Sequence, residues 1–213
     1  MREILLLRHA EPESARSYIG RGSDVGLSPQ GRIAAERIAE SLAAQRPERL
    51  YVSPMRRAME TMAPVATMLR LPMKVMDDLT EIDFGDWEGL DWRSIEERGA
   101  DAYHSWVDNP WKHSPPGGET LRELKYRVIT AFEGMLAEQG RFLLVSHAGP
   151  MRLILSHALN IHPQSSLNIG IAYGGFCRFR QMDRGILKLQ QWNVNLMRDS
   201  GPAKNARDPD EKQ

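Results

Sequence analysis

Two uninterrupted apolar runs are the clearest hydrophobic pattern in this chain. They occupy residues 4–7 (ILLL) and, far along the sequence, 142–145 (FLLV). Continuous Leu/Val/Ile runs are typical of strands that are buried on both faces of a parallel sheet. The expected strands cover residues 2–8, 49–52, 73–76 and 141–146, followed by a hairpin of 171–180 and 186–194.

Helical periodicity separates these strands. Ser28 is expected to cap a helix that begins at Pro29, because serine is a preferred N-cap and proline suits the first turn. The expected apolar stripe of this helix consists of Ile33, Ala34, Ile38, Ala39 and Leu42. A helix over 55–69 carries methionines that are expected to fill the core. Further helices are expected near 119–138 and 150–159. The alternation predicts an α/β fold, a three-layer α/β/α sandwich whose central sheet is mostly parallel and ends in a C-terminal antiparallel hairpin.

The segment 77–118 lacks such periodicity and reads as mostly irregular or short-helical. It contains Trp87, Trp92, Trp106 and Trp111, and residues 82–118 are expected to form a lid. Trp87 and Trp92 are interpreted as packing anchors, with stacking on a planar ligand ring as the alternative. Residues 1–197 are expected to form a single domain, and the polar tail 198–213 to be disordered.

Composition and charge narrow the function. The 213 residues are 41% hydrophobic and 26% charged, with 28 Lys+Arg and 28 Asp+Glu, so no global field favours nucleic acid or an anionic membrane. Cys177 is the only cysteine, which excludes an intrachain disulfide, and a buried structural thiol is expected. The chain has no apolar run of about 20 residues, the length that spans a bilayer. The N-terminus shows no signal-peptide pattern, so residence in the cytoplasm is expected.

Two histidines follow the two apolar strands directly. Arg8-His9 ends the first run, and Ser146-His147 ends the second. Ligands of α/β sheets bind beyond the carboxyl ends of the strands. A neutral imidazole can attack phosphorus, and a neighbouring guanidinium favours the neutral form and binds two phosphate oxygens. His9 is therefore a candidate nucleophile in a phosphate site. The alternative is that Arg8-His9 merely ends a strand at the surface.

Other strand ends bring further charged groups to the same crevice. Residues 53–58 (SPMRRA) follow the second strand and open a helix, so backbone N–H groups and Arg57 are expected there. Glu81 comes after the third strand and can exchange a proton with a leaving oxygen or with water. On chemistry alone, Asp83, Asp86 and Glu88 compete for that role. A solvated helix terminus is the alternative for 53–58.

In this combination the chain resembles the histidine phosphatase superfamily, which includes cofactor-dependent phosphoglycerate mutase. The resemblance runs in family order across residues 2–194. It rests on Arg8-His9, 27–31 (LSPQG), 53–58 (SPMRRA), 81–89 (EIDFGDWEG), 116–120 (PGGET) and 146–149 (SHAG).

The resemblance implies a role for each matched residue. His9 would be the phosphorylated nucleophile. Arg8, Arg57 and His147 would bind the phosphoryl group, and Glu81 would donate the proton. Arg21 and Ala148 are expected to contribute to substrate binding, and Arg56 to face solvent. The resemblance implies no cofactor and no metal, and its partner would be a small-molecule phosphate ester.

Departures from the family pattern favour a phosphatase over a mutase. Ala10 and Ala148 stand where glycine is usual. Ala15 stands where mutases carry asparagine, and the segment 89–115 is shorter than in a mutase. Residues 81–89 and 106–111 look like those of α-ribazole phosphatase, an enzyme of cobalamin assembly. A phosphoglycerate mutase and a catalytically silent phospho-ligand-binding module remain as alternatives. The sequence leaves the oligomeric state open and is compatible with a homodimer.

Overall fold

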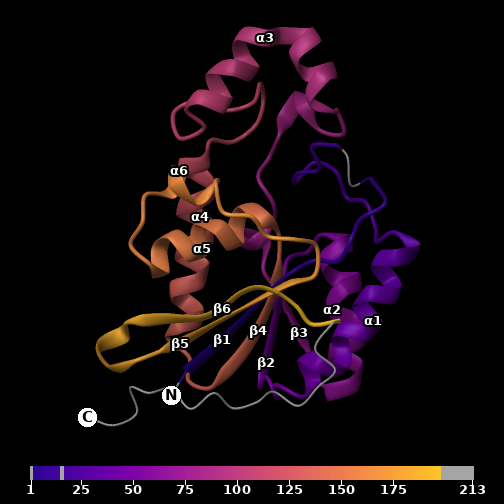
Figure 1. Cartoon of the computed structure of the whole chain (residues 1–213), viewed down its shortest axis with the longest axis vertical. Coiled ribbons are helices and arrows are strands. Elements are labelled where there is room, and N and C mark those ends of the chain that lie inside the picture. Colours follow the sequence, from indigo (N-terminus) through magenta and orange to yellow (C-terminus); the bar gives the residue numbers. More distant parts are fainter. Residues whose placement is uncertain (1, 15–16, 198–213) are drawn as a thin grey trace.

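A six-stranded sheet crosses the centre of the protein (Figure 1). The computed structural model describes residues 2–14 and 17–197, so the expectations for Ala15 and for the tail 198–213 lie outside the described residues. In sheet order the strands are β3 (Met73–Val75), β2 (Arg49–Val52), β4 (Arg141–Ser146), β1 (Arg2–Arg8), β5 (Gly175–Gln181) and β6 (Leu187–Asn195). The first four run parallel, and β5 and β6 form the antiparallel hairpin. The predicted sheet is confirmed.

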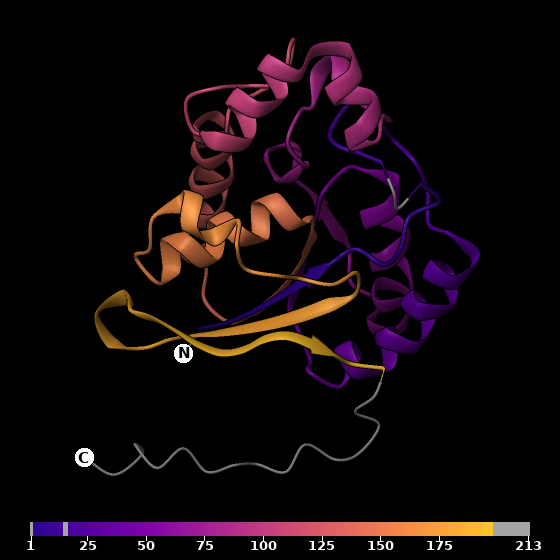
Figure 2. The same ribbon diagram turned by 45° about the horizontal axis from the view of Figure 1, so that its top comes forward.

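Helices cover both faces of the sheet (Figure 2). Leu5 and Leu7 of β1 pack with α1 (Pro29–Ala43) and α2 (Arg56–Leu69), whereas Ile4 and Leu6 pack with α4 (Leu121–Leu136) and α5 (Ala148–Ala158). Successive side chains of a strand point to opposite faces, so an uninterrupted apolar run supplies both interfaces at once. The three-layer sandwich is thus confirmed.

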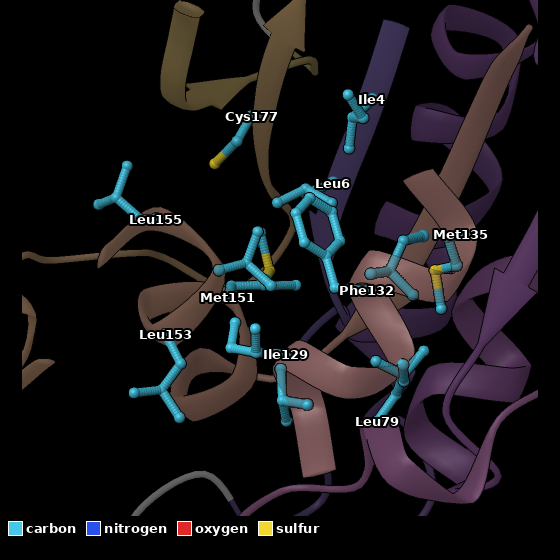
Figure 3. Close-up of a cluster of buried hydrophobic side chains, with 14 of the residues drawn as sticks. Ile4, Leu6, Leu79, Ile129, Phe132, Met135, Met151, Leu153, Leu155 and Cys177 are labelled. Atoms are coloured by element: carbon cyan, nitrogen blue, oxygen red, sulfur yellow. The ribbon is translucent and has the colours of Figure 1, made fainter. Parts of the chain in front are cut away.

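The core between the sheet and helices α4 and α5 contains the only cysteine (Figure 3). Cys177 lies in the same buried cluster as Phe132 and Met151. The thiol is fully buried, and this burial raises its pKa to about 12. The prediction of a structural thiol therefore agrees with the structure.

The buried face of α1 differs in part from the predicted stripe. Ser28 caps the helix as expected, its side chain accepting the Gly31 N–H at 2.9 Å. Ile33, however, is 55% exposed, and Ala35 is buried in its place. Gly31 also lies on the buried side, and only glycine fits there, because a Cβ would meet the Glu11 carbonyl oxygen at 2.1 Å. The loop that carries Glu11 lies so close to α1 that the helix turns its small residues, Gly31 and Ala35, toward the interior. In α2, Met62 is fully buried, which confirms its core role.

The expectation that 77–118 is mostly irregular or short-helical agrees with the structure in part, because the first half is mostly irregular and the second half is helical on both sides of a bend. The segment holds two short 3-10 turns, η1 (Asp77–Leu79) and η2 (Gly85–Trp87), and then α3 (Trp92–Asp108), which bends at Gly99. Figure 1 shows α3 at the end of the molecule farthest from the hairpin. The short helix α6 (Pro163–Ser166) and the 3-10 turn η3 (Asp183–Gly185) complete the fold. Across the described ranges, no helix is both long and apolar enough to cross a bilayer.

Candidate active site

Neighbouring strand ends bring the two histidines together. β4 lies between β1 and β2, and sheet-like hydrogen bonds continue past the strand ends, with His9 N–H donating to the Ser146 carbonyl (2.9 Å) and Ser53 N–H to the Val145 carbonyl (3.1 Å). The ring centroids of His9 and His147 are 5.0 Å apart. The predicted convergence at the carboxyl edge of the sheet is therefore observed.

His9 is held as a neutral imidazole with a free Nε2. Its Nδ1 lies 2.7 Å from the Ala10 carbonyl oxygen, which can only accept, so Nδ1 carries the proton. Burial and then the charges of Arg57 and Arg8 hold the pKa of His9 well below its ordinary value. The lone pair of Nε2 is consequently available without a base.

His147 lies beneath the cleft and is completely buried. Its Nε2 is 2.8 Å from Ser53 Oγ, which also accepts the Met55 N–H at 3.4 Å. The serine hydroxyl has one proton and two lone pairs, so it can either donate to Nε2 or accept from it. Burial, followed by the charges of His9 and Arg57, keeps the pKa of His147 well below its ordinary value. Within the described residues, Nδ1 of His147 is a buried polar atom without a hydrogen-bond partner.

Two arginines flank His9, of which Arg57 is buried and Arg8 is partly buried. Arg57 is 1% exposed and donates to the carbonyls of Ser23 (2.8 Å) and Gly20 (2.9 Å). Arg8 donates to the Ile171 carbonyl at 2.7 Å, and its guanidinium lies 3.9 Å from the centre of the Tyr173 ring. Burial lowers the pKa of both guanidinium groups, but arginine stays charged in proteins.

Neither of these arginines has a carboxylate within 4.0 Å in the described part of the chain. Two guanidinium groups without a carboxylate in direct contact, beside a neutral imidazole, form a site for a dianion.

Glu81 is the carboxylate that the cleft exposes to a ligand. Of the four acidic candidates in 81–89, only Glu81 lines the cleft. Its Oε1 accepts the N–H groups of Ile82 (3.0 Å) and Gly149 (3.2 Å). The backbone of Glu81 is held from outside, because Arg127 donates to its carbonyl at 2.8 Å and forms an ion pair with Glu119. Glu119 belongs to the 116–120 motif, so this motif fixes the segment that carries the acid.

Glu88, which competed with Glu81 on chemistry, holds the loop that positions Arg57. Its carboxylate accepts the N–H groups of Gly20 (2.9 Å) and Gly22 (3.0 Å) and the hydroxyl of Ser23 (2.5 Å). The carbonyls of Gly20 and Ser23 are the acceptors that grip Arg57. Glu88 therefore holds the loop that positions the guanidinium of Arg57.

The site opens into a cleft of about 310 Å³. Its lining residues are Arg8, His9, Pro12, Ser17, Tyr18, Ile19, Arg57, Glu81, Phe84, Trp92 and Tyr173. Within the described residues, no group of three or more His, Cys, Asp or Glu side chains is placed to hold a metal ion.

Comparison with known proteins gives the family. The histidine phosphatase superfamily (branch 1) matches residues 4–195. The chain belongs to the histidine phosphatase superfamily. Phosphoserine phosphatase 1 of Hydrogenobacter thermophilus is 30% identical over 170 residues, which cover 76% of this chain and 78% of that protein.

Two further relatives show how far the likeness extends. A bifunctional protein of Mycobacterium tuberculosis is 35% identical over 167 residues, 74% of this chain but only 44% of that protein. The crystal structure of the alpha-ribazole phosphatase from Shigella flexneri matches with a TM-score of 0.81 at 24% identity, covering 91% of this chain and 96% of that one. At that identity the match shows the fold.

The histidine phosphatase motifs place most, but not all, of the predicted residues at the cleft. Arg8, His9, Arg57 and Glu81 line it, and His147 lies directly below. Arg21 is exposed and lies outside the lining residues, and Ala148 is buried at the start of α5. Arg56 faces solvent as expected, 3.2 Å from Glu60.

Three aromatic residues of the cleft, Tyr18, Phe84 and Tyr173, were not assigned to it by the sequence analysis. Trp92 also lines the cleft, and for this residue the sequence analysis gave stacking on a ligand ring as the alternative to packing. The interpretation of Trp92 as a packing anchor is wrong, because its side chain is 50% exposed, whereas Trp87 is buried as predicted. Tyr173 was hidden in the strand expected over 171–180, but β5 begins only at Gly175, so Tyr173 belongs to the preceding loop. The uneven hydrophobicity of 171–174 (IAYG) is the signal that could have revealed this loop.

Proposed function

We propose that this protein is a metal-independent phosphomonoesterase that hydrolyses a small-molecule phosphate ester through a phosphohistidine on His9. The observation that carries the proposal is the state of His9. The ring is neutral, its Nδ1 is hydrogen-bonded to the Ala10 carbonyl, and its Nε2 is free. Arg8 and Arg57 line the same cleft and have no carboxylate within 4.0 Å in the described part of the chain. Such a group attacks phosphorus directly, while the guanidinium groups stabilise charge on the equatorial oxygens.

In the first step, Nε2 of His9 forms a bond to phosphorus and the ester P–O bond breaks. Glu81 gives its proton to the departing alcohol oxygen. Arg8, Arg57 and His147 bind the equatorial oxygens. The Ala10 carbonyl accepts a hydrogen bond from Nδ1–H of His9 throughout, which stabilises the positive charge that develops on the ring.

In the second step, water attacks the phosphohistidine on the face that the alcohol has left. Glu81, now ionised, accepts a proton from this water. The N–P bond breaks, its electron pair returns to Nε2, and inorganic phosphate leaves. The enzyme returns to its starting state, with Glu81 protonated and His9 neutral.

The proposal predicts that His9→Ala abolishes turnover and leaves the fold intact. The measurement is phosphate release in excess EDTA, together with capture of an acid-labile 32P-labelled enzyme after rapid quenching. Circular dichroism of the variant serves as the folding control. Unimpaired turnover by a folded His9→Ala protein would refute the proposal.

The same experiment separates the remaining alternatives. Activity that depends on added 2,3-bisphosphoglycerate, with little net phosphate release, would identify a mutase. Binding of phosphate esters without labelling would identify a silent binding module. For the natural substrate we propose α-ribazole 5′-phosphate, an assignment supported by the 81–89 and 106–111 segments and by the fold shared with an alpha-ribazole phosphatase. Phosphoserine, suggested by the name of a curated relative, is the competing substrate.

A further inference from the structure

The two arginines of the cleft are held in different ways. Within the described residues, Arg57 donates hydrogen bonds to three backbone carbonyls of the loop that follows β1. Arg8 donates to the Ile171 carbonyl alone, from Nη1 at 2.7 Å, and its Nε has no hydrogen-bond partner in the same part of the chain. One hydrogen bond does not fix the plane of a guanidinium at the end of a long side chain. A second contact is needed to hold the Arg8 guanidinium in one orientation.

The ring of Tyr173 supplies this second contact. The guanidinium carbon of Arg8 lies over the ring, 3.9 Å from its centre, and both residues line the cleft. The negative face of an aromatic ring attracts a cation, most strongly where water is excluded. A ring face and a carbonyl oxygen orient the guanidinium, but they do not neutralise its charge as a carboxylate would. The charge of Arg8 therefore stays available to an anion in the cleft.

The loop 171–174 delivers both of these contacts and is itself held in place. A backbone N–H of the loop donates to Asn193 Oδ1 of β6 at 2.8 Å, and Gly174 N–H donates to the His9 carbonyl at 3.1 Å. Between these two anchors, the Tyr173 ring lies 5.4 Å from the ring of His9. The ring is thus placed against the cation and the proposed nucleophile in advance, which reduces the ordering free energy lost on binding.

We propose that Tyr173 is a positioning residue of the phosphate site, whose ring face holds the Arg8 guanidinium in the orientation that binds the phosphoryl group. This inference rests on the proposed function. It adds a residue that lies outside every motif on which the family resemblance rests. Because Tyr173 acts through Arg8, its replacement lowers the affinity for phosphate only while the guanidinium is present.

Calorimetric titration with inorganic phosphate measures the contribution of the ring. Tyr173→Leu removes the ring but keeps an apolar side chain, and we expect it to bind phosphate about tenfold more weakly than the wild type. Tyr173→Phe keeps the ring face and should stay within about twofold of the wild type. Tyr126→Leu is the matched control and should bind phosphate normally, because Tyr126 is 78% exposed on α4 and outside the cleft. Circular dichroism checks that each variant is folded.

A double-mutant cycle with Arg8→Met shows whether the ring acts through the cation. In the Arg8→Met protein, Tyr173→Leu should lower the phosphate affinity by less than about twofold, because no guanidinium is left to orient. Independent losses that add in the double variant would overturn the inference. Loss of phosphate affinity in Tyr173→Phe would also overturn it, and this variant decides even where Tyr173→Leu does not fold.

Labelling of His9 distinguishes failure of this inference from failure of the proposed function. Absence of an acid-labile 32P-labelled enzyme, together with the expected phosphate affinities, would refute the phosphohistidine and support the role of Tyr173. Normal labelling together with unchanged phosphate affinity in Tyr173→Leu would overturn the role of Tyr173 and leave the proposed function in place.

Discussion

The carboxylate of Glu81 lies directly on the backbone of Gly149. A Cβ at position 149 would come within 2.3 Å of Glu81 Oε1, so only glycine permits this contact. The sequence places small residues after both histidines, and the structure shows that the essential glycine after His147 is the second one. Ala148 is tolerated because it faces the protein interior at the start of α5.

At this scale we expect Gly149→Ala to displace the carboxylate of Glu81 and to slow turnover. Because a positioned general acid contributes about 100- to 10,000-fold, partial displacement should lower kcat by about ten- to 100-fold. The affinity for inorganic phosphate should change much less, since Arg8 and Arg57 remain in place. Steady-state kinetics with phosphate as the competing inhibitor separates the two effects.

Gly134→Ala is the matched control for that substitution. Gly134 lies within α4, where an added Cβ meets nothing within 4 Å, so this variant should keep full activity and gain up to about 1 kcal/mol of stability. Equal loss of kcat in both variants would contradict a specific contact between Gly149 and Glu81.

The sequence predicts the residues at strand ends better than those in loops. Arg8, His9 and His147 follow buried strands directly, and the sheet order then fixes which of them meet. Trp92 lies at the first residue of α3 and Tyr173 lies just before β5, and the sequence pattern did not give the start of either element, so the positions of these two rings were not predicted.

Among the elements, the loop after β1 depends on a carboxylate that is distant in sequence. Glu88, just after η2, accepts three hydrogen bonds from Gly20, Gly22 and Ser23, and this loop in turn accepts from Arg57. In the 81–89 motif, Glu81 is thus the proposed proton donor, whereas Glu88 holds the loop that positions Arg57.

For this element we expect Glu88→Gln to weaken phosphate binding about tenfold. The amide loses one acceptor oxygen and the charge, and a hydrogen bond to a charged group contributes about 1.5–3 kcal/mol. Calorimetric titration with inorganic phosphate measures the loss.

Asp86→Asn is the isosteric control for Glu88→Gln, because Asp86 is exposed on η2 and lies outside the cleft. Unchanged phosphate affinity in the Glu88→Gln protein would show that the loop holds Arg57 without this carboxylate.

The sequence analysis did not predict the length of helix α3, and the structure shows a physical reason. α3 buries only Ile95 along its 17 residues, because it projects away from the sheet and packs little against other elements. The bend at Gly99 divides its apolar side chains, with Ile95 before the bend and Trp106 after it, so each half is short and the segment reads as irregular or short-helical. The strands and the helices α2, α4 and α5 bury continuous faces, so their hydrophobic patterns were sufficient to predict them.

Over the whole molecule, two buried neutral histidines link stability to pH. The pKa values of His9 and His147 lie well below the ordinary value in the folded state, whereas the unfolded chain binds protons near pH 6.5. Below that pH the unfolded state binds more protons than the folded state, so the free energy of unfolding decreases as the pH falls. Above about pH 6.5 neither state binds these protons, and the full stability is present.

We therefore expect the unfolding free energy of the wild type to decrease below about pH 6.5 more steeply than that of His9→Ala. The difference in slope should approach about 1.4 kcal/mol per pH unit for this one histidine. Urea unfolding from about pH 7.5 down to about pH 5 measures both curves. Parallel curves would show that His9 already titrates in the same range in the folded protein.

The burial of Cys177 has a practical consequence for redox chemistry. With the only thiol of the chain inside the core and its pKa raised to about 12, no reactive thiolate exists at neutral pH. The proposed nucleophile is a ring nitrogen, which peroxide and disulfide exchange do not modify. We therefore expect the proposed nucleophile to need no added reductant. Oxidising conditions that inactivate a cysteine-dependent phosphatase should leave this reacting group intact.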